Sequence, residues 1–252
     1  GPDGVYTVEQ LLQGLLMASG NDAAHALAQA VGGDDAALDK VNEKAREIGT
    51  RSTVAASYSG LDAAGMSTSA ADISLIYRAA FANDTFARIV DTEHVNFPGW
   101  GDLPGYELWN DNGLFLNDPD GIGGKTGYTE DARHTFVGAI NRGGRRLQAV
   151  ILDTTVDHGF RAWEQAQMLL DESSDVAPGE GVGQLEEFSA QAAEETTEVP
   201  TPAPPTPAEA PETEQPRSSF EDSQGWIGWL VAGLVTLLVI TVATFSLLRR
   251  EP

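Results

Sequence analysis

The composition of this chain changes sharply near residue 173, and the change limits which part of it can form a folded core. Residues 173–224 are rich in Pro, Glu, Thr, Ala and Ser, and they hold 12 acidic residues against one basic residue and eight of the chain's 13 prolines. Few apolar residues offset the entropy cost of ordering such a segment, and like charges extend it. We therefore expect a disordered linker over 173–224 and a folded domain built from residues 1–172.

The segment after the linker has the pattern of a membrane helix. It runs from Trp226 to Leu248 without a charged residue, and Arg249 and Arg250 follow it at once. About 20 apolar residues cross a hydrocarbon core of about 30 Å, and positive residues favour the cytoplasmic side. The pattern predicts one transmembrane helix over 225–248 and a cytoplasmic tail at 249–252. The chain would then be a single-pass protein of the cell membrane with its folded domain outside the cytoplasm. A buried core helix is the alternative.

The net charge argues against nucleic acid as a partner. It is −23 for the whole chain, and the acidic linker accounts for less than half of it. Nucleic-acid affinity comes mainly from lysine and arginine that neutralise phosphates, so an acidic surface opposes it. The four histidines lie in different segments without the spacing of paired metal ligands, and we expect no metal and no other cofactor.

The first 172 residues begin with helical patterns and end with strand patterns. Thr7 and Gln10 form a capping box ahead of a leucine stripe, and Ser19-Gly20-Asn21 interrupts that helix. Further helices are expected over 22–31, 36–48, 69–81 and 160–170, and strands over 95–97, 134–140 and 146–153. The stretch 98–123 is rich in Gly, Asn and Asp and is expected to be irregular. The order predicts an α+β fold.

Two short motifs contain residues suited to catalysis, Ser19-Gly20-Asn21 and Lys125-Thr126-Gly127. The first offers a hydroxyl that can relay a proton and an amide that can bind a peptide backbone, and the second offers a cation and a hydroxyl for a carboxylate. On its own, the first would more often be a helix-capping turn and Lys125 a solvated residue on an edge strand. Pro119 stands where a phosphate-binding loop would need its first glycine, which excludes that interpretation.

The order and context of these motifs resemble the serine D-Ala-D-Ala carboxypeptidases, the low-molecular-mass penicillin-binding proteins of peptidase family S11. The resemblance rests on the stretches 6–12, 17–24, 60–72 and 120–129. It implies a β-lactamase/transpeptidase-like fold, in which a helical subdomain accompanies an antiparallel sheet backed by helices. It also implies removal of the terminal D-alanine from peptidoglycan stem peptides through an acyl-enzyme, with β-lactams as covalent inhibitors of the full-length protein.

The same resemblance assigns roles to individual residues. Ser19, Asn21 and Lys125 would be catalytic. Substrate would be bound by Lys125, Thr126, Gly127, Tyr128 and Arg161, where Tyr128 contributes its backbone N–H to an oxyanion hole and Arg161 helps to hold the terminal carboxylate. One extra residue precedes Arg161 compared with the family pattern, and a surface arginine is the alternative there.

The third motif of these enzymes, Ser-x-x-Lys, is missing, because no serine in the chain has a lysine three residues later. That motif supplies the nucleophile and its base. We therefore expect a catalytic domain truncated at its N-terminus, with a fold incomplete there, and a 252-residue chain that is inactive. The alternative is a catalytically inactive, membrane-anchored peptidoglycan-binding or sensor protein. Within the enzymes, a transpeptidase or a class A β-lactamase-like hydrolase is the alternative.

Overall fold

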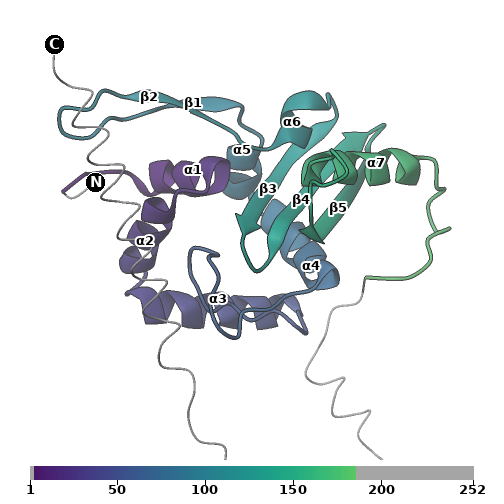
Figure 1. The fold of residues 1–252 in the computed structure, drawn as a ribbon, viewed down its shortest axis with the longest axis horizontal. Coiled ribbons are helices and arrows are strands. Elements are labelled where there is room, and N and C mark those ends of the chain that lie inside the picture. Colours follow the sequence, from purple (N-terminus) through teal and green to yellow (C-terminus); the bar gives the residue numbers. More distant parts are fainter. Residues whose placement is uncertain (1–2, 186–252) are drawn as a thin grey trace, which may run out of the picture. The chain divides into compact units, whose positions relative to one another are not determined.

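The computed structural model describes residues 3–185, in which helices come first and the main sheet last (Figure 1). In chain order the elements are α1 Val8–Ala18, α2 Asn21–Ala30, α3 Asp34–Ile48, α4 Ala70–Phe81, α5 Asp84–Val90, β1 His94–Phe97, β2 Tyr106–Trp109, α6 Gly113–Asn117, β3 Gly121–Thr129, β4 Arg133–Arg142, β5 Arg145–Thr154 and α7 Ala162–Ser174. The predicted α+β class is confirmed.

The first helix is capped and interrupted where the sequence predicts. The Thr7 hydroxyl accepts a hydrogen bond from the Gln10 backbone N–H at 3.1 Å, and the Gln10 side chain accepts one from the Thr7 N–H at 2.8 Å. α1 ends at Ala18, Ser19 takes the left-handed conformation with φ 56°, and α2 starts at Asn21. The interruption places the Ser19 hydroxyl at the end of a rigid helix.

The main sheet contains β3, β4 and β5 in that order, all antiparallel. β4 and β5 form the predicted hairpin, which turns at Gly143 and Gly144 with φ of 60° and 81°. Two successive positive φ angles are the requirement of a tight two-residue hairpin turn, and glycine meets it without strain. Within residues 3–185 no further strand pairs with the outer edge of β3 or of β5.

Helices cover both faces of this sheet. α7 packs on one face of β4 and β5, and α4 lies on the other (Figure 1). The core under α7 consists of Leu114, Phe136, Ile140, Ala149, Ala162, Ala166 and Leu170. On the α4 side, the Gln148 amide donates to the Ser74 carbonyl at 3.2 Å and the buried Tyr77 hydroxyl donates to the Gly123 carbonyl at 2.8 Å. The expected antiparallel sheet backed by helices is therefore present.

A second core holds the helical part together. Met17 of α1, Ile89 of α5 and Leu108 of β2 are buried against one another. Neither α5, β2 nor α6 was predicted, and the segment 98–123 was expected to be irregular. These elements are only four to seven residues long, too short to show a periodic pattern.

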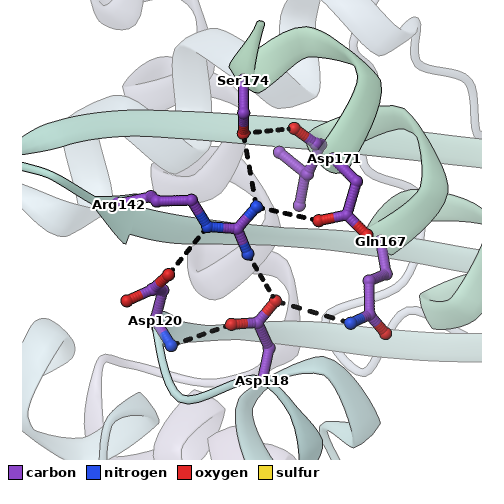
Figure 2. A network of polar contacts seen from close by, with 7 residues as sticks. Asp118, Asp120, Arg142, Gln167, Asp171 and Ser174 are labelled. Atoms are coloured by element: carbon purple, nitrogen blue, oxygen red, sulfur yellow. Dashed lines mark hydrogen bonds and ion pairs between the residues drawn. The ribbon is translucent and has the colours of Figure 1, made fainter.

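An ion-pair network joins the end of β4 to the segment before β3 and to α7 (Figure 2). The Arg142 guanidinium contacts the carboxylates of Asp118 at 3.1 Å, Asp120 at 2.7 Å and Asp171 at 2.9 Å. The Asp118 side chain is only 3% exposed, so its charge depends on this partner. The network fixes the start of β3 relative to the rest of the sheet.

Most of the predicted linker and all of the predicted membrane helix fall outside the described residues. α7 continues to Ser174, two residues beyond the predicted end of the domain. The rest of the linker from residue 186, the transmembrane helix over 225–248 and the tail at 249–252 lie outside the described part. In residues 3–185 no helix has both the length and the apolar character needed to cross a membrane.

Candidate active site

Strand β3 presents Lys125 and Thr126 to two different spaces. Lys125 lies opposite Val137 and Thr126 opposite Phe136 in the ladder with β4, and successive side chains point to opposite faces of a sheet. Lys125 borders a mainly apolar hollow of about 300 Å³ that α4 also lines. Thr126 borders in addition a groove of about 730 Å³ on the α7 side.

Two glycines let the backbone of β3 pass close to its neighbours just before Lys125. Gly123 has φ 91°, and a Cβ there would lie 2.4 Å from the Val90 carbonyl oxygen. A Cβ at Gly124 would lie 2.1 Å from the Val137 carbonyl oxygen. Since backbone atoms cannot move aside cheaply, only glycine fits at these two positions.

Gly127 has a similar restriction on the other side of the motif. A Cβ there would lie 2.5 Å from the Thr135 hydroxyl oxygen on β4. Gly127 also lines the 730 Å³ groove. The missing side chain thus keeps the groove open beside Thr126.

The two predicted motifs meet at Lys125. Its ammonium donates a hydrogen bond to the hydroxyl oxygen of Ser19, 106 residues earlier in the chain. It also donates to the Thr126 carbonyl oxygen at 2.8 Å. Ser19 is held in place because its N–H donates to the Leu15 carbonyl at 3.1 Å as the last bond of α1. A serine hydroxyl and a lysine amine are thereby brought into direct contact.

The surroundings of Lys125 favour loss of its proton. The side chain is 29% exposed, and burial lowers the pKa of Lys125, although the nearby Asp111 carboxylate raises it in part. Desolvation disfavours the charged form of an amine. An amine whose pKa lies closer to neutrality exchanges protons more readily. Lys125 and Ser19 can therefore pass a proton between them.

Asp111 belongs to the same group, and sequence reasoning missed it. Its carboxylate accepts a hydrogen bond from the Thr126 hydroxyl at 2.9 Å and lies 3.8 Å from the Lys125 ammonium. Its N–H donates to the Met17 carbonyl at 2.9 Å, which ties it to the end of α1. The only sequence signal was the polar run Asn110-Asp111-Asn112, which predicted irregular structure and no contact.

Arg161, Tyr128 and Asn21 are the remaining residues predicted for the site. Arg161, exposed at the start of α7, lines the 730 Å³ groove together with Thr126 and Gly127. The exposed ring of Tyr128 packs on the His134 ring, with centroids 4.6 Å apart. Asn21 is exposed at the first position of α2, and within residues 3–185 no hydrogen bond joins its side chain to Ser19 or Lys125. The structure thus brings the two motifs into contact and places Thr126 and Gly127 in one groove with Arg161, but it leaves Asn21 unconnected.

The described residues contain no group of three or more His, Cys, Asp or Glu side chains arranged to hold a metal ion. The polar groups that meet at Lys125 are its own ammonium, the hydroxyls of Ser19 and Thr126 and the carboxylate of Asp111.

The fold and this group of residues define an α+β protein of the transpeptidase-like class. A structure of D-alanyl-D-alanine carboxypeptidase from Mycobacterium tuberculosis superposes with a TM-score of 0.69 at 44% identity, over 73% of this chain and 70% of that one. A structure of the DD-transpeptidase from Streptomyces K15 superposes with a TM-score of 0.60 at 28% identity, over 66% and 67% of the two chains.

The sequence comparisons are more specific. Residues 2–156 match the family model for D-alanyl-D-alanine carboxypeptidase, and the chain belongs to this family. It is 44% identical over 187 residues to the D-alanyl-D-alanine carboxypeptidase DacB2 of Mycobacterium tuberculosis, and 29% identical over 157 residues to DacF of Bacillus subtilis. The matches cover 73% and 60% of this chain. The chain spans 64% of the length of the first relative and 39% of that of the second.

Proposed function

We propose that this chain provides the substrate-binding and proton-relay side of a serine D-Ala-D-Ala carboxypeptidase, which removes the terminal D-alanine from peptidoglycan stem peptides. The observation that carries the proposal is the contact between Ser19 and Lys125 beside Thr126. Three residues predicted from two distant motifs converge there. Family membership supports the reaction type.

Each group has a task in such a reaction. Attack on the carbonyl of the penultimate D-alanine produces an oxyanion and a leaving amine, and the amine needs a proton. The Ser19 hydroxyl and the Lys125 amine would deliver that proton. Thr126 and Arg161 would hold the terminal carboxylate, and the Tyr128 N–H would stabilise the oxyanion.

The nucleophile and its base are not among these 252 residues. In a complete active site they would come from a Ser-x-x-Lys segment beside Lys125. The hollow of about 300 Å³ next to Lys125 is lined by apolar side chains of α4 and β4, among them Ile73, Ile76 and Val137. We propose that this hollow receives the apolar face of the helix that carries the motif.

Three measurements on the purified 252-residue chain test the proposal. We expect an acetylated D-Ala-D-Ala peptide to bind more tightly than its L-Ala-L-Ala counterpart in calorimetry, and Thr126→Val to weaken that binding about tenfold, because a hydrogen bond to a charged group is lost. We expect no release of D-alanine and no labelling by a fluorescent penicillin, because the chain has no nucleophile. Equal binding of the two peptides would contradict the proposal.

The alternative is a peptidoglycan-binding or sensor protein without catalysis, for which a missing Ser-x-x-Lys motif would be the natural state. Binding of the D-Ala-D-Ala peptide is expected under both functions. The sequence of the reading frame before Gly1 separates them. A Ser-x-x-Lys about sixty residues before Ser19 supports the enzyme, whereas a protein that begins without it supports the binding function.

We also propose that the chain is anchored in the cell membrane, on the evidence of the uncharged stretch from Trp226 to Leu248 and the two arginines after it. The full chain should float with liposomes in a density gradient. A version that ends at residue 224 should stay at the bottom, and flotation of both would refute the anchor.

A further inference from the structure

We propose that Asp111 is a built-in competitor for the substrate carboxylate, which holds the Thr126 hydroxyl in the unliganded chain and must release it when a peptide with a free C-terminus binds. The inference rests on the proposed function, in which Thr126 binds that carboxylate. It adds a residue that determines how strongly the groove discriminates between charged and neutral peptide ends.

The only proton of the Thr126 hydroxyl is already donated in the unliganded chain. A threonine hydroxyl has one proton to donate, and in the structure that proton goes to the Asp111 carboxylate at 2.9 Å. A second carboxylate cannot receive the same hydrogen bond at the same time. A substrate that uses Thr126 therefore has to displace Asp111 from it.

The charges of Asp111, Lys125 and Arg161 also make Asp111 a competitor of an arriving carboxylate. Asp111 lies 3.8 Å from the Lys125 ammonium and so neutralises the cation nearest to Thr126. Asp111 lines the 730 Å³ groove together with Arg161. Arg161 forms no ion pair within the described residues. The net positive charge available to an arriving anion thus comes from Arg161, while Asp111 repels it.

Asp111 is free to move its side chain but not its backbone. The side chain is 38% exposed, whereas the backbone N–H is fixed to the Met17 carbonyl. Rotation of the carboxylate toward solvent would release the Thr126 hydroxyl without moving the short segment between β2 and α6, which the Asp111 N–H ties to α1.

The experiment compares Asp111→Asn and Asp111→Ala with the parent chain and with Glu130→Gln, which removes the same charge from an exposed position just after β3. The probes are acetyl-D-Ala-D-Ala with a free C-terminus and the same peptide with a C-terminal amide. We expect both Asp111 variants to bind the free acid on the order of fivefold more tightly than the parent chain, because a neighbouring like charge is removed. The amide should bind the same to all four chains.

The outcomes separate this inference from the proposed function. Unchanged or weaker binding of the free acid by both variants, with clear binding by the parent, would overturn the role of Asp111 and leave the proposed function in place. Tighter binding of acid and amide alike would also overturn it, because competition concerns the carboxylate alone. Failure of all four chains to bind the free acid would overturn both.

Discussion

At the scale of single residues, Lys125 is the group whose chemistry depends most on its position. Burial lowers the pKa of Lys125, and this holds despite the opposing effect of Asp111. The unfolded chain therefore keeps this proton to a higher pH than the folded chain does. Folding stability should rise with pH as Lys125 loses its proton, because the cost of burying a charge disappears.

The titration of Lys125 can be measured directly, because Lys40, Lys44 and Lys125 are the only lysines in the chain. We expect lysine labelled with ¹³C at Cε to give a Lys125 signal that titrates at lower pH than that of Lys44. A hydrogen bond and the charge of Glu47 raise the pKa of Lys44, which makes it an internal reference. A Lys125 midpoint at or above that of Lys44 would contradict the effect of burial.

The conformation of Ser19 gives a second prediction at this scale. Its φ of 56° is costly for any residue with a Cβ. Ser19→Gly and Ser19→Ala both remove the hydroxyl, but only glycine relieves the strain. We expect the glycine variant to exceed the alanine variant in free energy of unfolding by about 1 kcal/mol in urea titrations. Equal stabilities would mean that Ser19 leaves this conformation in solution.

The site residues that could be predicted from sequence are those that belong to short local motifs. Ser19 and Lys125 were found because each lies in a run of three characteristic residues, and the structure brings them into contact. Asp111 was missed because its role arises only when the segment before α6 folds back against α1 and β3. Such a contact leaves no periodic or motif signal in the sequence.

At the scale of elements, Asp72 connects the start of α4 to the loop after α3. Its buried carboxylate accepts hydrogen bonds from the N–H groups of Arg51 at 3.0 Å and Ser52 at 2.7 Å and from the Thr53 hydroxyl at 2.9 Å. Burial alone would raise the pKa of Asp72, but these hydrogen bonds outweigh it and hold the pKa below its usual value.

Replacement of Asp72 should therefore destabilise the fold. We expect Asp72→Ala to lower the free energy of unfolding by about 3 kcal/mol, because three donors lose a shared charged acceptor. The effect should be complete above pH of about 4, the pKa of an unfolded aspartate, and should fade as pH falls through the lower pKa of the folded state. Asp35→Ala, at an exposed position in α3, is the control in the same denaturation series.

Sequence patterns predicted most of the longer elements and the short strand β1, but not α5, β2, α6 or the nine-residue strand β3. α1, α3, α4 and α7 have apolar stripes and recognisable starts, and the β4–β5 hairpin has two glycines at its turn. α5 and α6 depend on asparagine caps, Asn83 and Asn112. Asn112 lies in the segment 98–123, which contains too many turn-forming residues for such a cap to stand out, whereas α5 after Asn83 is too short to show a helical period.

At the scale of the whole described domain, the Arg142 network connects parts that are far apart in sequence (Figure 2). Arg142→Met would leave the Asp118 carboxylate buried beside Asp120 without its cation. We expect a fall of several degrees in the melting temperature, clearly larger than for Arg133→Met, which breaks the more exposed pair with Asp153.

A second change should reverse part of that loss. Asp120→Asn, added to Arg142→Met, removes one of the three carboxylates that lose their shared cation, so the double variant should melt above the single one in calorimetry. A double variant that melts lower still would show that the network acts through packing of the arginine stem and not through charge.

The outer edge of β5 has a practical consequence for anyone who handles this chain. Within the described residues that edge offers unpaired N–H and C=O groups over the ten residues Arg145–Thr154. A long strand with a bare edge can pair with the same strand of another copy, which joins two three-stranded sheets into one. We therefore expect self-association that increases with protein concentration, and dilute samples are the safer choice for every experiment above.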